Sequence, residues 1–194
     1  IGISSPISNW AWDFGDGGSS SLQHPAHTYT IAGTYTVTLV VTDLNGCIDS
    51  VQHDVLVWPA PVANFGNDTV CVGYPTQFTD LSIANADSLV GWIWNFGDGG
   101  TSTLQDPTHT YLLNGIYNVT LSVTNSNGCV DDTTITVEVY PNPIADFSDS
   151  SHCDFTVYFT DLTTPNSTGI STWSWTFGDG GTSALQHPIH TYAT

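Results

Sequence analysis

Apolar and polar residues alternate most clearly over residues 34–42, which read TYTVTLVVT. The apolar face of this segment carries Tyr35, Val37, Leu39 and Val41, and the other face carries mostly threonine. A period of two residues is typical of an antiparallel strand with one buried and one solvent-facing side. The pattern therefore predicts a half-buried strand here, and its recurrence over residues 116–124 predicts a second one.

Tight turns and further strands follow these two segments. An Asn-Gly pair, typical of short hairpins, occurs at Asn45-Gly46 and again at Asn127-Gly128. We expect further strands, rich in β-branched and aromatic residues, over residues 48–57, 76–81, 133–139 and 155–162. No segment of useful length shows the 3.6-residue period of a helix. The chain is therefore expected to be all-β and built from sandwiches.

One phrase occurs three times along the chain. WAWDFGD, WIWNFGD and WSWTFGD begin at Trp10, Trp92 and Trp173, so successive copies are 82 (92 − 10) and 81 (173 − 92) residues apart. Two tryptophans and a phenylalanine of each phrase alternate onto one face, which is most simply a strand facing the core. A period of this size indicates tandem copies of one small domain.

Proline-rich junctions divide the chain into three repeats. We define repeat 1 as residues 1–60, repeat 2 as residues 61–141 and repeat 3 as residues 142–194. Repeat 2 is expected to be complete, repeat 1 to be truncated at its N-terminal side and repeat 3 at its C-terminal side. Because half a domain cannot bury its own core, we expect either further repeats or strands of a neighbouring molecule to complete the outer two.

The charge of the chain is one-sided. Among 194 residues there are 18 acidic side chains and no lysine or arginine, which gives a formal net charge of −18. Without basic side chains to hold phosphate, nucleic acid and anionic membranes are not expected as partners. No stretch approaches 18 uninterrupted apolar residues, so no membrane insertion is expected. Most of the 7 tryptophans are expected in the core, whereas Trp58, at a junction, is expected to pack between adjacent repeats.

The repeated phrase continues as Pro-x-His-x-Tyr and then as Gly-x-Tyr-x-Val-x-Leu-x-Val. In repeat 2 the positions are Trp94, Phe96, Gly97, Asp98, Gly99, Pro107, His109, Tyr111, Gly115, Tyr117, Val119, Leu121 and Val123. This pattern resembles the PKD (polycystic kidney disease) domain, an immunoglobulin-like β-sandwich, over essentially the whole chain. The Cys-Val-Gly and Asn-Gly-Cys sequences are similar to those of PKD arrays in secreted or cell-surface proteins of the Bacteroidetes.

The resemblance implies a non-catalytic extracellular or cell-surface module. We expect a structural or adhesive array, a glycosylated surface protein or a fibre subunit, whose partners are neighbouring repeats or identical chains in a head-to-tail array or filament, with glycans as further partners. Two alternatives stay open: an accessory spacer of a secreted hydrolase that binds polysaccharide or protein, and a calcium-dependent adhesin. No Gly-x-Ser-x-Gly or His-Glu-x-x-His motif occurs, and no catalytic residue is assigned.

The turn aspartates Asp16, Asp98 and Asp179 have two interpretations. Carboxylates in a turn suit calcium, but the residue spacing of a calcium loop is absent. An aspartate beside glycines ordinarily accepts hydrogen bonds from its own turn. Turn capping is therefore expected, and calcium stays an alternative without assigned ligands; no other cofactor is expected.

Two histidine pairs, His24 with His27 and His187 with His190, are spaced three residues apart. Zinc would need a third and a fourth ligand, which the sequence does not supply nearby. We therefore expect a structural hydrogen bond from the second histidine of each pair and assign no metal ligands.

Four cysteines recur at fixed places in the repeats: Cys47, Cys71, Cys129 and Cys153. Such recurrence indicates disulfides and an oxidising compartment, and four cysteines allow three pairings. The immunoglobulin-like path that the resemblance implies would put Cys71 and Cys129 at opposite ends of one domain. On that resemblance, disulfides between neighbouring repeats are favoured, some with cysteines outside this stretch of sequence.

Seven side chains are candidates for attached sugars. Three Asn-x-Ser/Thr sequons begin at Asn67, Asn118 and Asn166, and Asn118 falls on the outward face of its expected strand. Asp-Ser/Thr motifs similar to those O-glycosylated in Bacteroidetes proteins place further candidates at Ser50, Thr69, Ser88 and Thr133.

Overall fold

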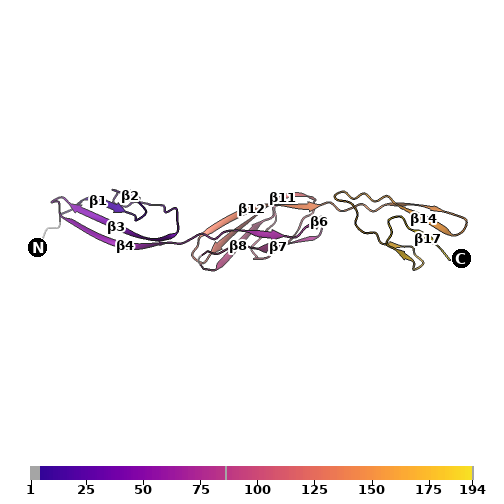
Figure 1. Cartoon of the computed structure of the whole chain (residues 1–194). Coiled ribbons are helices and arrows are strands. Elements are labelled where there is room, and N and C mark those ends of the chain that lie inside the picture. The colour runs from indigo at the N-terminus through magenta and orange to yellow at the C-terminus, as the bar shows by residue number, and fades with distance from the viewer. Residues whose placement is uncertain (1–4, 86, 194) are drawn as a thin grey trace. The chain divides into compact units, whose positions relative to one another are not determined.

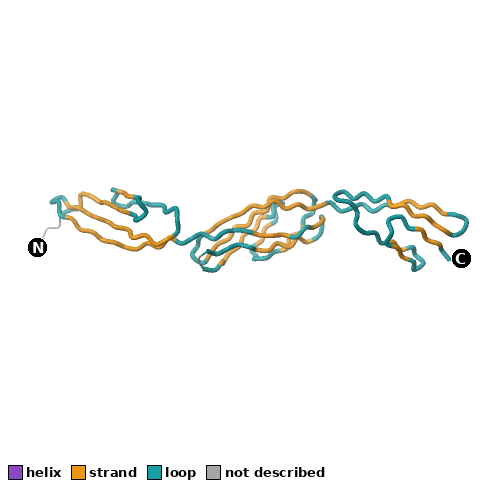
Figure 2. The backbone as a smooth tube through the Cα atoms, in the orientation of Figure 1, coloured by secondary structure: helices purple, strands orange, loops and turns teal. Residues whose placement is uncertain are grey.

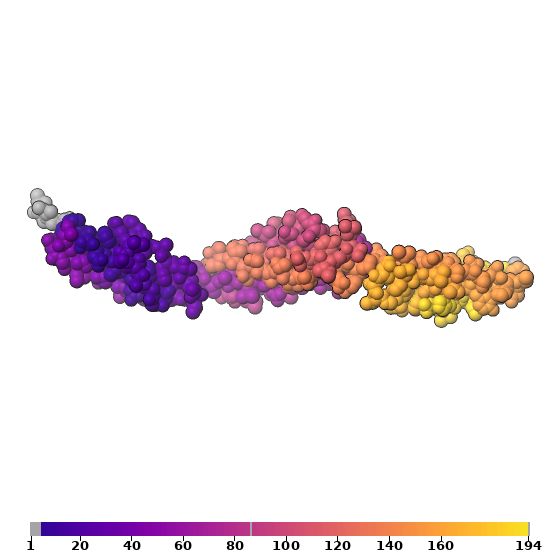
Figure 3. Space-filling view, turned by 90° about the horizontal axis from the view of Figure 1, so that it is seen from above, coloured from indigo at the N-terminus to yellow at the C-terminus, as the bar shows by residue number. Residues whose placement is uncertain are grey.

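The structure is a computed structural model that describes residues 5–85 and 87–193, and within them every regular element is a β-strand (Figures 1 and 2). Every sheet of the described residues is built from strands of a single repeat. Figure 3 shows the surface of the chain coloured by residue number. The prediction of an all-β chain is confirmed. Each repeat is described by itself below.

Repeat 2 contains two sheets. The strands of the first are β5 (Phe65–Asn67), β7 (Pro75–Asp80) and β10 (Thr108–Thr110). The strands of the second are β6 (Val70–Cys71), β8 (Leu89–Asn95), β9 (Thr101–Ser102), β11 (Gly115–Asn125) and β12 (Val130–Tyr140). Their orders are β10-β7-β5 and β6-β12-β11-β8-β9.

Aromatic rings from both sheets meet in the core of repeat 2. The ring of Trp94 on β8 lies 5.1 Å from that of Phe65 on β5 and 5.5 Å from that of Phe78 on β7, between centroids. Aliphatic side chains of β11 and β12 complete this core, namely Val119, Leu121, Val123, Val137 and Val139. Repeat 2 is therefore a β-sandwich whose strands turn alternate residues inward, as the period of two predicts.

Repeat 1 forms one sheet in its described residues. Its strands are β1 (Ile7–Asp13), β2 (Ser19–Ser20), β3 (Gly33–Asp43) and β4 (Ile48–Val57). Their order is β2-β1-β3-β4, and β3 and β4 form a hairpin that pairs from Gly33 opposite Val57 to Thr42 opposite Ile48.

Repeat 3 forms the other kind of sheet. The strands β13 (Phe147–Ser151), β14 (Thr156–Asp161) and β17 (Ile189–Thr191) pair in the order β13-β14-β17. Two short strands, β15 (Trp175–Thr176) and β16 (Thr182–Ser183), pair only with each other.

The strands predicted from the pattern are present. Those expected over residues 34–42, 48–57, 76–81, 116–124 and 155–162 correspond to β3, β4, β7, β11 and β14, with ends that shift by one residue or none. β12 begins at Val130 rather than residue 133, because hydrogen bonding resumes at the turn, where the Asn125 amide donates to the Cys129 carbonyl (3.0 Å).

The Asn-Gly turn of repeat 2 is a tight hairpin, as predicted. Gly128 has φ 80°, a left-handed value that favours glycine. The side-chain oxygen of Asn125 accepts hydrogen bonds from the Asn127 amide (3.1 Å) and the Cys129 amide (3.0 Å). Its side-chain nitrogen donates to the Pro59 carbonyl (3.2 Å), so this buried residue ties the turn to the proline-rich junction that precedes repeat 2.

Asparagine clamps hold the chain where it enters repeats 2 and 3. Asn85 and Asn166 adopt left-handed backbone angles of 63° and 59°. The side-chain amide of Asn85 donates to the Ala60 carbonyl, and that of Asn166 donates to the Asn142 carbonyl, both at 2.9 Å. Asparagine is one of the few residues that tolerate this conformation.

Candidate functional site

The repeated phrase builds one side-chain cluster, which is seen most completely in repeat 2. One oxygen of the Asp98 carboxylate accepts a hydrogen bond from the Gly100 amide (2.9 Å), and the other lies 2.7 Å from Nε2 of His109. The His109 ring stacks on Phe96 at 4.2 Å and meets the edge of Tyr111 at 4.7 Å. The Tyr111 hydroxyl donates to the Phe96 carbonyl (3.1 Å), which closes the cluster.

The same cluster occurs in the other two repeats. The distance from histidine Nε2 to the carboxylate is 2.8 Å for His27 and Asp16, and 2.7 Å for His190 and Asp179. In both repeats the imidazole stacks on the phenylalanine of the phrase at 4.1 Å. Three independent copies of one geometry indicate that the phrase encodes a local structural unit.

The second glycine of the turn is required by close approach. A Cβ atom added to Gly100 would lie 2.6 Å from Cε1 of His109 and 3.0 Å from a carboxylate oxygen of Asp98. Both neighbours are fixed by the hydrogen bond between them, so neither can move aside cheaply. The Gly-Gly sequence therefore lets the imidazole lie directly over the turn.

Hydrogen bonds favour the ionised form of the turn aspartates. The hydrogen bond from His27 and then that from the Gly18 amide hold the pKa of Asp16 below its ordinary value of 3.8. For Asp98, partial burial raises the pKa, but the hydrogen bonds from His109 and Gly100 together outweigh it, so the pKa is again lowered. The carboxylates are therefore anionic acceptors at neutral pH.

The expectation that these aspartates cap their own turns agrees with the structure. Both carboxylate oxygens of Asp98 already accept hydrogen bonds within the repeat. Among the described residues, no group of three or more histidine, cysteine, aspartate or glutamate side chains is placed to hold a metal ion. The turn aspartates therefore act as hydrogen-bond acceptors inside the fold.

The two histidines of each pair have different surroundings. His27 and His190 make the structural hydrogen bond expected of the second histidine. His24 is exposed, while Nδ1 of His187 accepts a hydrogen bond from the Asp161 amide (3.1 Å). His187 and His190 thus belong to separate hydrogen-bond sets, and His24 takes no part in the hydrogen bond that His27 makes.

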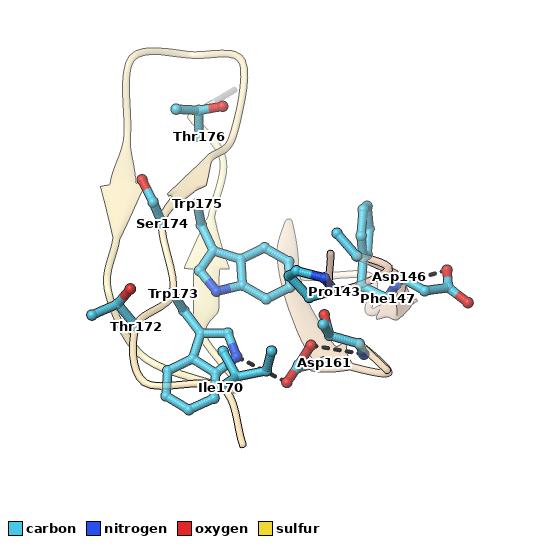
Figure 4. A pocket seen from close by; sticks show the side chains of 12 residues that line it. Pro143, Asp146, Phe147, Asp161, Ile170, Thr172, Trp173, Ser174, Trp175 and Thr176 are labelled. Atoms are coloured by element: carbon cyan, nitrogen blue, oxygen red, sulfur yellow. Dashed lines mark hydrogen bonds between the residues drawn. The ribbon is translucent and has the colours of Figure 1, made fainter. Parts of the chain in front are cut away.

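Repeat 3 contains a pocket of about 470 Å³. Figure 4 shows the indole nitrogen of Trp173 directed at Asp161 and the ring of Trp175 extending toward Pro143 and Phe147. The Trp173 nitrogen donates to the Asp161 carboxylate at 2.8 Å. Hydrogen bonds from Thr163, Trp173 and Gln186 hold the pKa of Asp161 well below its ordinary value. The recurrence of Phe-Thr-Asp-Leu at residues 78–81 and 159–162 is the sequence signal that points to this aspartate.

The pocket lies where repeat 2 has its core. Phe65, the counterpart of Phe147, is 4% exposed, whereas Phe147 is 54% exposed. Trp94, the counterpart of Trp175, is fully buried in repeat 2, whereas Trp175 is half-buried. Phe147 and Trp175 are therefore sandwich-core residues that stay partly exposed in repeat 3.

All four cysteine thiols are free in the structure. Cys129 precedes β12, and Cys71 lies on β6, which pairs with the far end of β12 through Tyr140. A strand of 11 residues extends about 35 Å, well beyond the roughly 7 Å between Cα atoms that a disulfide spans. Pairing of Cys71 with Cys129 inside repeat 2 is therefore ruled out, and pairing between neighbouring repeats stays a prediction.

The candidate sugar sites differ in accessibility. The exposed ones are Ser50, Thr69, Ser88, Asn67, Asn118 and Asn166. The side-chain amide of Asn67 donates to the Asp68 carbonyl (2.8 Å), and that of Asn166 belongs to the clamp described above. Thr133 is half-buried and lies on the same face of β12 as the core residue Val137. Six of the seven candidates therefore present their side chains on the surface of this chain.

Two further expectations concerned membrane insertion and the position of Trp58. Within the residues that the structure describes, no helix is long and apolar enough to cross a membrane. Trp58, expected to pack between repeats, is 47% exposed.

Several proteins are similar to this chain over part of their length. The pre-pro-metalloprotease PrtV of Vibrio cholerae is 31% identical over 134 residues, which are 69% of this chain and 14% of that protein. The collagenase ColA of Bacillus cereus is 35% identical over 89 residues, or 44% of this chain and 9% of that protein. The matches cover only the PKD part of these proteases, which is a non-catalytic module.

The similarity extends to solved structures and to a family model. The PKD1 domain of Vibrio anguillarum Epp is 34% identical, with a TM-score of 0.41, and the match covers 43% of this chain and 96% of that domain. The family model described as PKD domain matches three times in tandem, over residues 3–57, 58–139 and 140–194. The chain therefore belongs to the PKD domain family, in tandem immunoglobulin-like repeats.

Proposed function

We propose that this chain is part of a non-catalytic extracellular array whose repeats serve as structural and adhesive units of a surface protein or fibre. One observation carries the proposal. In all three repeats the most distinctive polar side chains, the turn aspartate and its histidine, bind each other rather than facing an open site. An aspartate and a histidine that bind each other stabilise their own repeat, and successive repeats then give the array its length.

The surface chemistry supports the same function. The outward faces of the long strands are rich in hydroxyl groups, which pair across strands, as in the 2.8 Å contact between Thr120 and Thr134. The net charge of −18, with no basic side chain, keeps such an array soluble and repels like chains except where their surfaces fit. Neighbouring repeats and identical chains are accordingly the partners that we propose.

Modification of the array belongs to the same proposal. The exposed hydroxyl and asparagine candidates, Ser50, Thr69, Ser88, Asn67, Asn118 and Asn166, are available for glycans. Disulfides between neighbouring repeats would stiffen the array in an oxidising compartment. Intact mass of native material, measured with and without reduction, tests both: added hexose-type mass and a change on reduction are expected, and an unmodified mass in both states would remove them.

A second candidate function is that of an accessory spacer in a secreted hydrolase. It is favoured by the relatives, a metalloprotease and a collagenase, in which the matching residues are a small part of the protein. Such a spacer would bind an insoluble polymer and hold an enzyme near it.

Co-sedimentation separates the two candidates. The chain is incubated with insoluble collagen, chitin or cellulose, and the bound fraction is measured after centrifugation. The array function predicts that nearly all of the chain stays in the supernatant with every polymer. Saturable retention of most of the chain on one polymer would contradict the array function and favour the accessory spacer.

A further inference from the structure

One hydrogen-bond acceptor at the end of a strand differs between repeats 2 and 3. In repeat 2 the backbone amide of Asp80, the last residue of β7, donates to the carboxylate of Asp106 at 2.8 Å. In repeat 3 the amide of Asp161, the last residue of β14, donates to Nδ1 of His187 at 3.1 Å. Asp106 and His187 occupy the same place in the sequence Leu-Gln-x-Pro, so the two repeats use different acceptors for one hydrogen bond.

The surroundings of this hydrogen bond are shared by the two repeats. The side-chain amide of Gln105 donates to the Asp80 carboxylate at 3.3 Å, and that of Gln186 donates to the Asp161 carboxylate at 3.2 Å. One residue after the acceptor, a proline carbonyl accepts the amide of a strand phenylalanine at 2.9 Å in both repeats. Because the same geometry occurs in repeat 2, whose core is closed, it does not depend on how much of the core of repeat 3 is covered.

The two acceptors respond differently to acid. An imidazole nitrogen accepts a hydrogen bond only while it carries no proton, because both nitrogens of a protonated ring are donors. Imidazole side chains ordinarily take up this proton at about pH 6.5, whereas a carboxylate ordinarily stays an acceptor down to about pH 4. In mild acid the Asp161 amide therefore loses its acceptor, while the Asp80 amide keeps the Asp106 carboxylate.

The residue that donates this amide also carries an anion. The Asp161 carboxylate accepts hydrogen bonds from Trp173 at 2.8 Å and from Gln186 at 3.2 Å. Hydrogen bonds from Thr163, which contribute most, act with these to hold the pKa of Asp161 well below its ordinary value, so the carboxylate stays ionised in mild acid. A neutral His187 ring thus binds the amide of Asp161, whereas a protonated ring is attracted to its carboxylate and competes there with Trp173 and Gln186.

Other titratable groups lie on the neighbouring segments of repeat 3. Asp146, just before β13, and Asp149, on β13, lie on the far side of β14 from β17, because the sheet order is β13-β14-β17. On the β17 side, His190 and Asp179 bind each other at 2.7 Å. Protonation of His187, which lies two residues before β17, is therefore expected to act mainly at the end of β14.

We propose that His187 is a pH-dependent switch that holds the end of β14 at neutral pH and releases it in mild acid. Repeat 2, with Asp106 at the same place, keeps the end of β7 fixed under both conditions. His24 stands at this place in repeat 1, so histidine and aspartate alternate along the three repeats. The switch acts within a single repeat and does not depend on the array function.

Residue-resolved hydrogen exchange of the 194-residue chain tests the switch. Exchange is followed by NMR at about pH 7.5 and at about pH 5.5, on either side of the ordinary imidazole titration, and is corrected for the intrinsic effect of pH on amide exchange. Protection of the Asp161 amide should fall about fivefold or more at the lower pH, the usual effect of losing one hydrogen bond. Protection of the Asp80 amide should stay the same.

Exchanging the two acceptors gives variants whose new residue the same site already holds in the other repeat. Asp106→His should make the Asp80 amide lose protection in mild acid, and His187→Asp should make the Asp161 amide keep it. Asp106→Asn is the matched control, because its side-chain oxygen accepts at both pH values and carries no charge. NMR spectra at neutral pH show whether each variant keeps its strands.

Two results would overturn the proposal. The first is unchanged protection of the Asp161 amide in the unmodified chain over the pH range in which the ring signals of His187 titrate. This measurement needs no variant, so it decides the matter even if a variant does not fold. The second is an equal loss of protection at Asp80 in Asp106→His and Asp106→Asn, because the loss would then come from the missing charge and not from protonation of an imidazole.

Discussion

Repeat 2 shares some of its core side chains with each of the outer repeats, yet these side chains differ in burial. Phe65 is 4% exposed in repeat 2, and its counterpart Phe147 is 54% exposed in repeat 3. The difference extends to secondary structure: β8 is 7 residues long, whereas the matching strand β15 has 2 residues. Similar sequences therefore become regular strands only as far as a hydrogen-bonding partner is present, which is the expected dependence of strands on tertiary context.

We expect the largest difference in stability between truncation of Phe65 and truncation of its counterpart Phe147. Phe65→Ala removes a ring packed against Trp94 and should destabilise repeat 2 by about 3–5 kcal/mol, the usual cost of such a truncation in a core. Phe147→Ala removes a ring that is already half in solvent and should cost about 1 kcal/mol. Urea unfolding of the dilute chain, followed by hydrogen exchange in β11 and β14, measures both. Equal costs would contradict the difference in packing.

The turn glycine gives the next largest effect. Gly100→Ala would put a methyl group 2.6 Å from the His109 ring and should destabilise repeat 2 by about 1–3 kcal/mol. Gly91→Ala is the matched control, because its added Cβ meets only Thr124 at an ordinary 3.5 Å. The melting temperature of repeat 2 should fall for the first variant and stay within a few degrees of the unmodified protein for the second. A fall in melting temperature for both variants would show that replacing a glycine destabilises the repeat without any clash with the His109 ring.

Removal of the histidine itself should have a similar or smaller effect. His109→Ala loses both the hydrogen bond to Asp98 and the stacking on Phe96, for which about 1–2 kcal/mol is expected. His53→Ala, an exposed histidine on β4, is the control and should change stability little. Chemical denaturation measures the two variants. An unchanged midpoint for His109→Ala would mean that the cluster does not hold the turn.

Acid should produce the smallest effect, through the turn aspartates. Because the folded-state pKa of Asp98 is below 3.8, its ionised form stabilises the fold fully above that pH. This contribution is lost as the pH falls through the lower folded-state pKa. Asp98→Asn cannot titrate, so its melting temperature should fall less steeply than that of the unmodified protein below about pH 4. Parallel curves for the two proteins would show that the aspartate makes no such contribution.

Much of the fold could be predicted because its signals are local. The period of two in residues 34–42 and 48–57 identifies β3 and β4 almost to the residue, since alternation reflects one buried face. Asn127-Gly128 likewise fixes a hairpin through its own backbone preferences. These features need no knowledge of distant residues.

The remaining features depend on contacts between distant residues. The hydrogen bond between Asp98 and His109 spans 11 residues, and the sequence alone predicted turn capping for that aspartate without identifying the histidine as its partner. The inward position of Thr133 depends on where β12 begins, because a shift of one residue reverses the face of every side chain. The length of β15 depends on which strands pair with it, and the alternation of apolar and polar residues within a segment does not show its pairing partners.

The most direct test of the difference between repeats is hydrogen exchange measured on matching strands of the dilute chain. Amides of residues 119–123 in β11 lie over a closed core, and those of residues 37–41 in β3 lie over an open face. Exchange in β11 should be slower by about a hundredfold or more, since sub-global opening costs less where fewer apolar contacts must break. Equal protection of the two strands would contradict the account, because it would mean that the repeat 1 face needs no partner sheet.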